Sequence, residues 1–297
     1  MKTKNSKTGL SFGKTALLLA LGILTAALPA RATLLFSGVE MGETIGRTSG
    51  IQWAAFAHTG GITIADTGVQ TPIPAITGNL GVAASNITIS GTTKVSGTAY
   101  IKTGGSLRRS GTAFVTGNGG LAVTNAGNDT LMNQVKADAI SATSQADALA
   151  NFNVGGFVNW GSLTNINQNT DLSVTDGGSG AHVVLHLTDF VLFGGAKLTL
   201  TGTAAASYII NVSGNFSLLG GKVLLAGGLL PENVLFNVVG AGSSVTLNAA
   251  AQYNGFILAN DRTVNITGGA KITGTLIAGK VNISGGSKII KPTYTSP

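Results

Sequence analysis

One short repeat limits the possible fold of this chain more than any other feature. Residues 87–98 read ITISGTTKVSGT, and residues 264–275 read VNITGGAKITGT. Both copies alternate β-branched with small polar residues, then pass through a glycine turn to a lysine and another short strand. Alternation of period two predicts half-buried strands, and the glycines predict turns at fixed offsets. We therefore expect an all-β chain that stacks its strands as the coils of a right-handed parallel β-solenoid.

Further copies of the repeat suggest the length of a coil. Fragments recur at residues 194–198 and 285–289, and Gly268 and Gly285 are 17 residues apart. Residues 97–101 also recur as residues 111–115, which we interpret as neighbouring coils. These spacings predict N-terminal coils over 61–123 and C-terminal coils over 172–291.

One segment between these two strand blocks has a helical pattern. Its apolar residues are spaced alternately by three and four: Met132, Val135, Ala139, Ala142, Ala146 and Leu149. This spacing predicts a long α-helix over about 129–152, with Asn128 or Asp129 as its N-cap. We expect the helix to lie along the solenoid and shield one side of its core, with a partner-binding helix as the alternative.

The N-terminus has the pattern of a secretory signal peptide. Four lysines precede a run of small and apolar residues over 15–30, and Ala30-Arg31-Ala32 fits a cleavage site before Thr33. The alternative is a signal anchor, but the run is short for a membrane span. We expect residues 1–32 to be removed and the rest, 33–297, to form one domain that is secreted or held at the cell surface.

Removal of residues 1–32 would lower the net positive charge of the chain, and with it the case for a nucleic-acid partner. The full chain has 18 basic and 11 acidic residues, and five of the basic ones lie in residues 1–32, which leaves 13 against 11. So small an excess argues against a nucleic-acid partner. The chain has no cysteine, and we expect no transmembrane segment after residue 32. Residues 33–60 are expected to be a lead-in or cap, with Trp53 and Phe56 closing the open end of the core.

Several segments together suggest a family. The chain resembles two related groups, the bacterial ice-binding-like β-solenoids and the choice-of-anchor A surface domains. The resemblance lies in five short segments: residues 53–57, 76–82, 233–238, 254–260 and 274–280. The order of strand block, helix and strand block resembles the ice-binding-like proteins over nearly all of residues 33–297. This resemblance implies a solenoid that is discontinuous in sequence, with N-terminal coils packed beside C-terminal ones.

Titratable residues do not form a recognisable catalytic pattern. His182 and His186 would share one strand face about 13 Å apart, too far to bind one metal ion. The acids near strands or loops, Asp171, Asp176 and Asp189, do not form pairs beside a basic residue, and Glu40 and Glu43 lie in the lead-in. We therefore predict no enzyme activity, no catalytic residues, no metal site and no cofactor.

Two sets of residues are candidates for surface binding. Thr-x-Thr patterns predict outward hydroxyl groups at five positions: Thr199, Thr201, Thr203, Thr273 and Thr275. Four lysines hold equivalent places in the repeat and would form a ladder if the coils stack in register: Lys94, Lys197, Lys271 and Lys288. Such a ladder would either attract an anionic polysaccharide or discourage association between sheets.

The sequence thus favours an exported, non-enzymatic protein with a structural or adhesive role, whose partner is an extracellular surface or a polysaccharide matrix. The first alternative is an ice-binding protein that presents a flat, nearly uncharged surface of Thr, Ser and Asn. The second alternative is a carbohydrate-active enzyme or glycan-binding β-helix.

Overall fold

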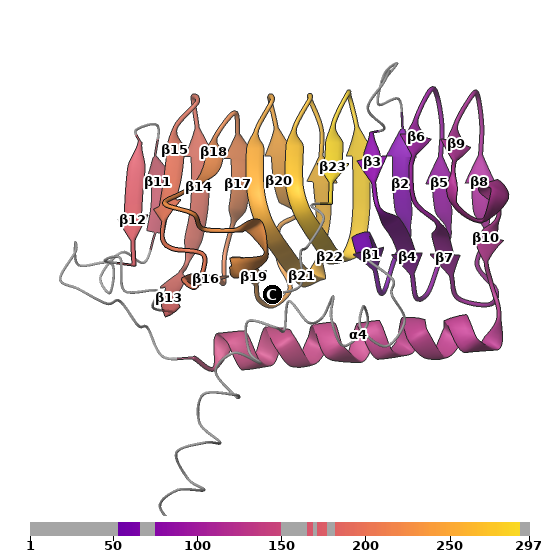
Figure 1. Ribbon diagram of the computed structural model, residues 1–297, viewed down its shortest axis with the longest axis horizontal. Coiled ribbons are helices and arrows are strands. Elements are labelled where there is room, and N and C mark those ends of the chain that lie inside the picture. The colour runs from indigo at the N-terminus through magenta and orange to yellow at the C-terminus, as the bar shows by residue number, and fades with distance from the viewer. Residues whose placement is uncertain (1–52, 66–74, 150–164, 169–170, 177–181, 292–297) are drawn as a thin grey trace, which may run out of the picture.

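The computed structural model describes residues 53–65, 75–149, 165–168, 171–176 and 182–291. These residues form one parallel β-solenoid with a long helix beside it (Figure 1). The predicted β-solenoid, discontinuous in sequence and flanked by one helix, is therefore confirmed. The expected signal sequence 1–32 and most of the expected lead-in 33–60 lie outside the described residues.

Each full coil passes through three faces, which we name face A, face B and the helix face. Face A contains β2 (Ile62–Ala65), β5 (Ile87–Ile89), β8 (Leu107–Arg109), β11 (Asn165–Gln168), β14 (Asp189–Phe193), β17 (Phe216–Leu219) and β20 (Val245–Asn248). Face B contains β3 (Ile76–Thr77), β6 (Lys94–Val95), β9 (Phe114–Val115), β12 (Leu172–Thr175), β15 (Lys197–Thr201), β18 (Lys222–Ala226) and β23 (Lys288–Ile290). The helix face contains β1 (Trp53–Ala57), β4 (Asn79–Val82), β7 (Ala99–Ile101), β10 (Ala122–Val123), β13 (His182–Leu187), β16 (Ser207–Val212) and β19 (Val234–Val238). Two long strands, β21 (Gln252–Ile266) and β22 (Lys271–Ser284), bend through face B, the helix face and face A in turn.

The described chain enters the stack in its middle. Strand β1 pairs with β22 on one side and with β4 on the other. The N-terminal coils extend from there to β10, and the helix α4 (Ala126–Asp147) then runs back along the helix face. The C-terminal coils return from β11 to β23, which pairs with β3 (Figure 1). The two blocks of coils therefore form one continuous stack in space.

The glycines of the repeat turn the chain between faces A and B. Gly268 and Gly269 have φ values of 60° and 77°, and Gly285 and Gly286 of the next coil have the same values. This left-handed conformation is readily available only to glycine. A Cβ atom on Gly268 would also lie 2.2 Å from Asn248 Oδ1 of the coil below. Glycine therefore fits this corner without strain, which explains its recurrence in the repeat. In the coil below, Ala249 and Ala250 take the same left-handed conformation, with φ values of 54° and 58°.

The shorter repeat of residues 97–101 and 111–115 does not mark neighbouring coils, so that interpretation was wrong. Residues 99–101 form β7 on the helix face, whereas residues 114–115 form β9 on face B. Short strands that follow a glycine have similar sequences on different faces, because each needs only a turn and an inward apolar residue.

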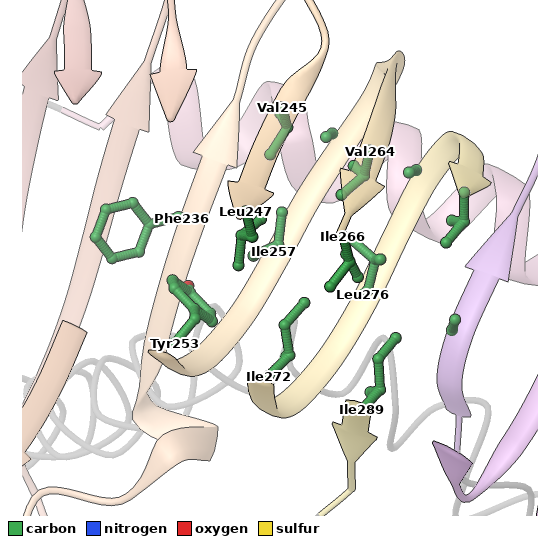
Figure 2. Close-up of a cluster of buried hydrophobic side chains, with 14 of the residues drawn as sticks. Phe236, Val245, Leu247, Tyr253, Ile257, Val264, Ile266, Ile272, Leu276 and Ile289 are labelled. Atoms are coloured by element: carbon green, nitrogen blue, oxygen red, sulfur yellow. The ribbon is translucent and has the colours of Figure 1, made fainter. Parts of the chain in front are cut away.

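Aliphatic side chains from all three faces fill the interior (Figure 2). Each inward position stacks on an equivalent one in the next coil, as Leu247 does on Ile266. An aromatic row runs through the C-terminal coils, with neighbouring ring centroids 4.9–5.5 Å apart: Phe190, Phe216, Phe236 and Tyr253. Burial of each large side chain contributes about 1.5–3 kcal/mol, so this core is the main source of stability.

The helix begins and ends earlier than its apolar spacing predicted. It spans Ala126–Asp147, and its N-cap is Asn125, whose side chain accepts a hydrogen bond from the backbone N–H of Asn128. Asn128 was a predicted cap, but it lies inside the helix and donates to the Ile101 carbonyl of β7 at 2.7 Å. The cap must be the residue with extended backbone before the first turn, and Asn125 has that conformation.

The helix covers the helix face through apolar contacts and a row of buried asparagines. Met132, Val135 and Ala139 pack on the outward apolar residues of this face. The side-chain amides of Asn211, Asn237 and Asn260 donate to the carbonyls of Ala146, Thr143 and Ala139, respectively. Buried amide groups need such partners. The prediction that the helix lies along the solenoid and shields its core is therefore confirmed.

Trp53 and Phe56 lie at the junction of the two blocks of coils and not at an open end, so that prediction was wrong. Both rings are buried beside Gly81, where an added Cβ would approach Trp53 at 2.6 Å and Phe56 at 2.5 Å. The backbone carbonyl of Trp53 accepts a hydrogen bond from Thr275 of β22 at 2.8 Å. Since β1 is paired on both sides, its aromatic residues help to join the coils.

Hydrogen bonds from one arginine, Arg262, connect the turns between the helix face and face A. Arg262 is 3% exposed, and its guanidinium donates to carbonyls of two neighbouring coils. The accepting residues are Gly240, Gly214, Ser243, Ser213 and Val239, at 2.6–3.0 Å. All five donors of the side chain are thus used. The carbonyl partners of Arg262 lie in other coils, so no sequence pattern predicts this role.

Replacement of Arg262 by alanine should lower the free energy of unfolding by about 2–4 kcal/mol, because five partly buried carbonyl groups lose a charged donor and the packing of a buried side chain is lost. Urea denaturation of the purified protein measures this change. Arg108→Ala, at an exposed position of β8, is the matched control and should change stability by less than about 0.5 kcal/mol. Equal effects of the two substitutions would contradict the role given to Arg262.

One buried histidine also lies at the junction, at the end of β1. His58 is 2% exposed, and its backbone N–H donates to the Ala278 carbonyl at 3.0 Å. Burial, and then the positive charge of Lys136, lower the pKa of the His58 imidazole from 6.5. Asp261 and Asn260 act in the opposite direction but do not reverse the shift. At pH 7 the neutral form of His58 is therefore favoured in the folded protein.

This lowered pKa should make the protein less stable in mild acid. The unfolded chain binds the proton near pH 6.5, and the folded chain binds it only at lower pH. The free energy of unfolding should thus fall as the pH drops from about 6.5 through the folded pKa. Urea denaturation at a series of pH values between 4 and 8 measures the change. His58→Gln should reduce this slope, and an unchanged slope in this variant would contradict the effect given to the buried imidazole.

Candidate functional site

Face A carries an unbroken outward row of mostly short polar side chains, which we name the face A column. In stacking order its members are Asn167, Val191, Ser217, Thr246, Asn265, Asn282, Thr63, Thr88 and Arg108. The row continues across the junction, because Asn282 of β22 pairs with Thr63 of β2. Residues far apart in the sequence thus form one straight surface feature.

The strands hold this column at a regular spacing. Each central member lies between two inward aliphatic residues, as Thr63 lies between Ile62 and Ile64, both fully buried. Neighbouring parallel strands are about 4.8 Å apart, so the outward groups repeat at that interval. The amide of Asn282 also donates to Asn265 Oδ1 at 2.9 Å, which links two members directly. The only charged member is Arg108, at one end of the column.

Face B carries a row with different chemistry, which we name the lysine column. Its members are Lys197, Lys222, Lys271, Lys288 and Lys94, with Gln252 and Ala75 at the intervening places. The predicted ladder of Lys94, Lys197, Lys271 and Lys288 is therefore present, and the structure adds Lys222. Lys197 forms an ion pair with Asp171 at 3.3 Å at one end, and Phe114 follows Lys94 at the other.

The predicted threonines lie in three different settings. Thr199 and Thr201 point outward from β15, and Thr273 lies on the same face in a more distant coil. Thr203 is exposed in the turn after β15. Thr275, however, is 4% exposed and donates to the Trp53 carbonyl, so its predicted surface position was wrong. Between Thr273 and Thr275, Gly274 has φ 153° and the chain turns a corner, so the two threonines lie on different faces.

The face A column was not identified from the sequence, although a signal exists. Its central strands share a triplet in which one polar residue separates two aliphatic residues, at residues 62–64, 87–89, 245–247, 264–266 and 281–283. Each triplet is too short to stand out alone. Only the register of the stack shows that the triplets lie side by side.

The remaining candidates do not converge on a reactive site. His182 contacts the Ser207 hydroxyl, while His186 contacts the Leu149 carbonyl at 2.6 Å near the end of the helix. Asp189 accepts a backbone hydrogen bond from Asn215 at 2.6 Å. Within the described ranges, no three His, Asp or Glu side chains lie close enough together to hold a metal ion. In the same ranges no helix is both long and apolar enough to cross a membrane.

Comparison with solved structures places the fold among ice-binding β-solenoids. An ice-binding protein from an Arctic yeast has a TM-score of 0.55 at 19% identity, over 82% of this chain and 93% of that chain. An ice-binding protein domain from Shewanella frigidimarina has a TM-score of 0.49 at 16% identity, over 82% and 95%. The first likeness supports the shared fold.

Sequence comparison gives the same family. An ice-binding protein of Flammulina populicola is 37% identical over 84 residues, which are 28% of this chain and 32% of that relative. The matched stretch thus spans about a third of the relative's length. A family model for a putative ice-binding-like adhesive domain matches residues 47–289. Because this match covers most of the chain, the protein belongs to the family of ice-binding-like adhesive domains.

Proposed function

We propose that the protein binds ice, and that the face A column is the centre of the binding surface. The observation that carries this proposal is the unbroken register of the column across both blocks of coils. A crystalline surface is itself periodic, so a protein that binds it needs groups at regular intervals over a long distance. Face A provides such a row.

The side chains of this column suit the ordering of water. Hydroxyl and amide groups hydrogen-bond with water, and the threonine methyl groups leave small apolar patches between them. Threonine is also stiff at χ1 and loses little conformational freedom when it binds a surface. The strands beneath are fixed by a fully buried core, so the row should keep its spacing. Ordered water between protein and ice would then cost little entropy.

The other two faces are less suitable. The helix face is covered by α4. Face B carries the lysine column, and ammonium groups hold their own hydration shells strongly. Its outward row beside the lysines is also interrupted by large apolar residues, Leu224 and Ile290. Face B does carry three of the predicted threonines, Thr199, Thr201 and Thr273, and could bind ice in place of face A. Substitutions on the two faces distinguish these possibilities.

The relatives support this assignment and a location outside the cell. The family name and the relatives' names refer to ice binding, which makes our first alternative from the sequence the better reading. Ice binding requires no catalysis, in line with a non-enzymatic role. We further propose that residues 1–32 direct export, because ice forms outside cells.

A structural or adhesive role at an extracellular surface is the second candidate. The family description itself includes the word adhesive, and it is this description that favours such a role. Adhesion requires a surface ligand other than ice. The two functions are separable, because only ice binding affects the growth of ice crystals.

Substitution of Thr63 and Thr246 by lysine should abolish ice recrystallisation inhibition and thermal hysteresis, because two bulky charges would then project from the face A column. Both positions point outward, so the fold should persist, and circular dichroism checks this. The matched control is Thr199→Lys with Thr273→Lys on face B, which should retain activity. Loss of activity in the control alone would assign ice binding to face B. A wild-type protein without activity would leave only the adhesive role.

A further inference from the structure

The lysine column is a second regular surface that ice binding does not use. Its five lysines take five of the seven places in one row of face B, close to the corner with face A, and Gln252 and the buried Ala75 take the other two. Among the described residues, only Lys197 of this column is ion-paired. At about 4.8 Å per strand, the row from Lys197 to Lys94 extends about 29 Å. We propose that the lysine column binds a linear acidic polysaccharide.

The charge distribution favours a polyanion at this place. Residues 33–297 hold 13 basic and 11 acidic residues, and five of the 13 lie in this single row. The neighbouring face B column has no charge: Ser173, Thr199, Leu224, Asn254, Thr273, Ile290 and Thr77. On the other side of the corner, Phe193, Leu219, Asn248, Ser284 and Ala65 are also uncharged. In the part of the chain that the structure describes, the acidic group paired with this row is Asp171, at one end.

The length of the row indicates a polymer as the ligand. A small anion could contact two neighbouring lysines, such as Lys271 and Lys288, but not the whole column. A chain with negative groups at intervals could contact every lysine at once, and the modest gain at each exposed pair would add up. Extended lysine rows therefore favour a linear polyanion over a free phosphate or carboxylate.

The groups beside the lysines favour a sugar polymer over a nucleic acid. Thr199, Thr273 and Ser173 present hydroxyl groups that can hydrogen-bond with sugar hydroxyls. Phe114, 49% exposed, pairs with Lys94 and offers one apolar ring against which a sugar ring can pack. Binding of single-stranded nucleic acid usually relies on several aromatic platforms, and duplex binding on a wider basic surface. A single lysine row fits neither as well as it fits a polyuronate.

The test measures binding of the purified protein to alginate, a polyuronate, at several salt concentrations. The variant Lys222→Gln, Lys271→Gln and Lys288→Gln removes three central charges, and Gln252 shows that glutamine fits this column. We expect at least about a tenfold loss of affinity at low salt and a shallower salt dependence. The control Lys102→Gln, Lys136→Gln and Lys280→Gln removes the same charge elsewhere and should change affinity less than about twofold.

A second variant separates the ring contact from the charges. Phe114→Ser should weaken alginate binding while leaving its salt dependence unchanged, because no charge is removed.

Ice recrystallisation inhibition should be unaffected by the glutamine variant, so failure of this proposal is distinguishable from failure of ice binding. Three results would overturn the proposal: no binding of alginate by the wild type, equal binding of neutral dextran, or equal losses in both triple variants. Tighter binding of DNA than of alginate would also overturn it.

Discussion

The parallel hydrogen bonds between β22 and the β1–β2 segment join parts of the chain that are far apart in the sequence. The Thr59 hydroxyl, for example, donates to the Gly279 carbonyl at 3.1 Å, across 220 residues. Strands β1 and β2 pair with β22 over most of their length, and β3 pairs with β23 in the same register. A slip of one residue here would turn every inward side chain of the N-terminal coils outward. The junction therefore fixes the core and both surface columns together.

The helix makes this arrangement possible and also protects it. It carries the chain from one end of the stack to the other, so the last coil can meet the first described one. It also buries apolar residues of the helix face, such as Ile209 and Leu235, that would otherwise be exposed. The asparagine row beneath it has amide groups whose partners are helix carbonyls, which sets the position of the helix along the stack. Apolar contacts alone would be less specific.

Local sequence patterns predicted the coils well and their surfaces less well. The copy of the repeat at residues 264–275 matches the copy at residues 87–98, because each must supply inward aliphatic residues, a glycine corner and a position for lysine. Those needs are local, so they are visible in the sequence. Which way a threonine points after a corner is not local, as Thr275 shows, because one glycine changes the face. Arg262 and the face A column depend on contacts between coils, and no short window contains both partners.

A solenoid of this kind separates its surface chemistry from its stability. On each strand the inward residue holds the coil, while the outward residue between two inward ones contacts mainly its neighbours in the column. Outward positions can therefore change without disturbing the core, provided the corner glycines remain. The corner also separates face A from face B, so a row that is uncharged except for Arg108 and a row of lysines can lie on adjacent faces. A protein that binds both a crystal surface and a polymer could then keep one scaffold, because the outward residues of each face can change independently.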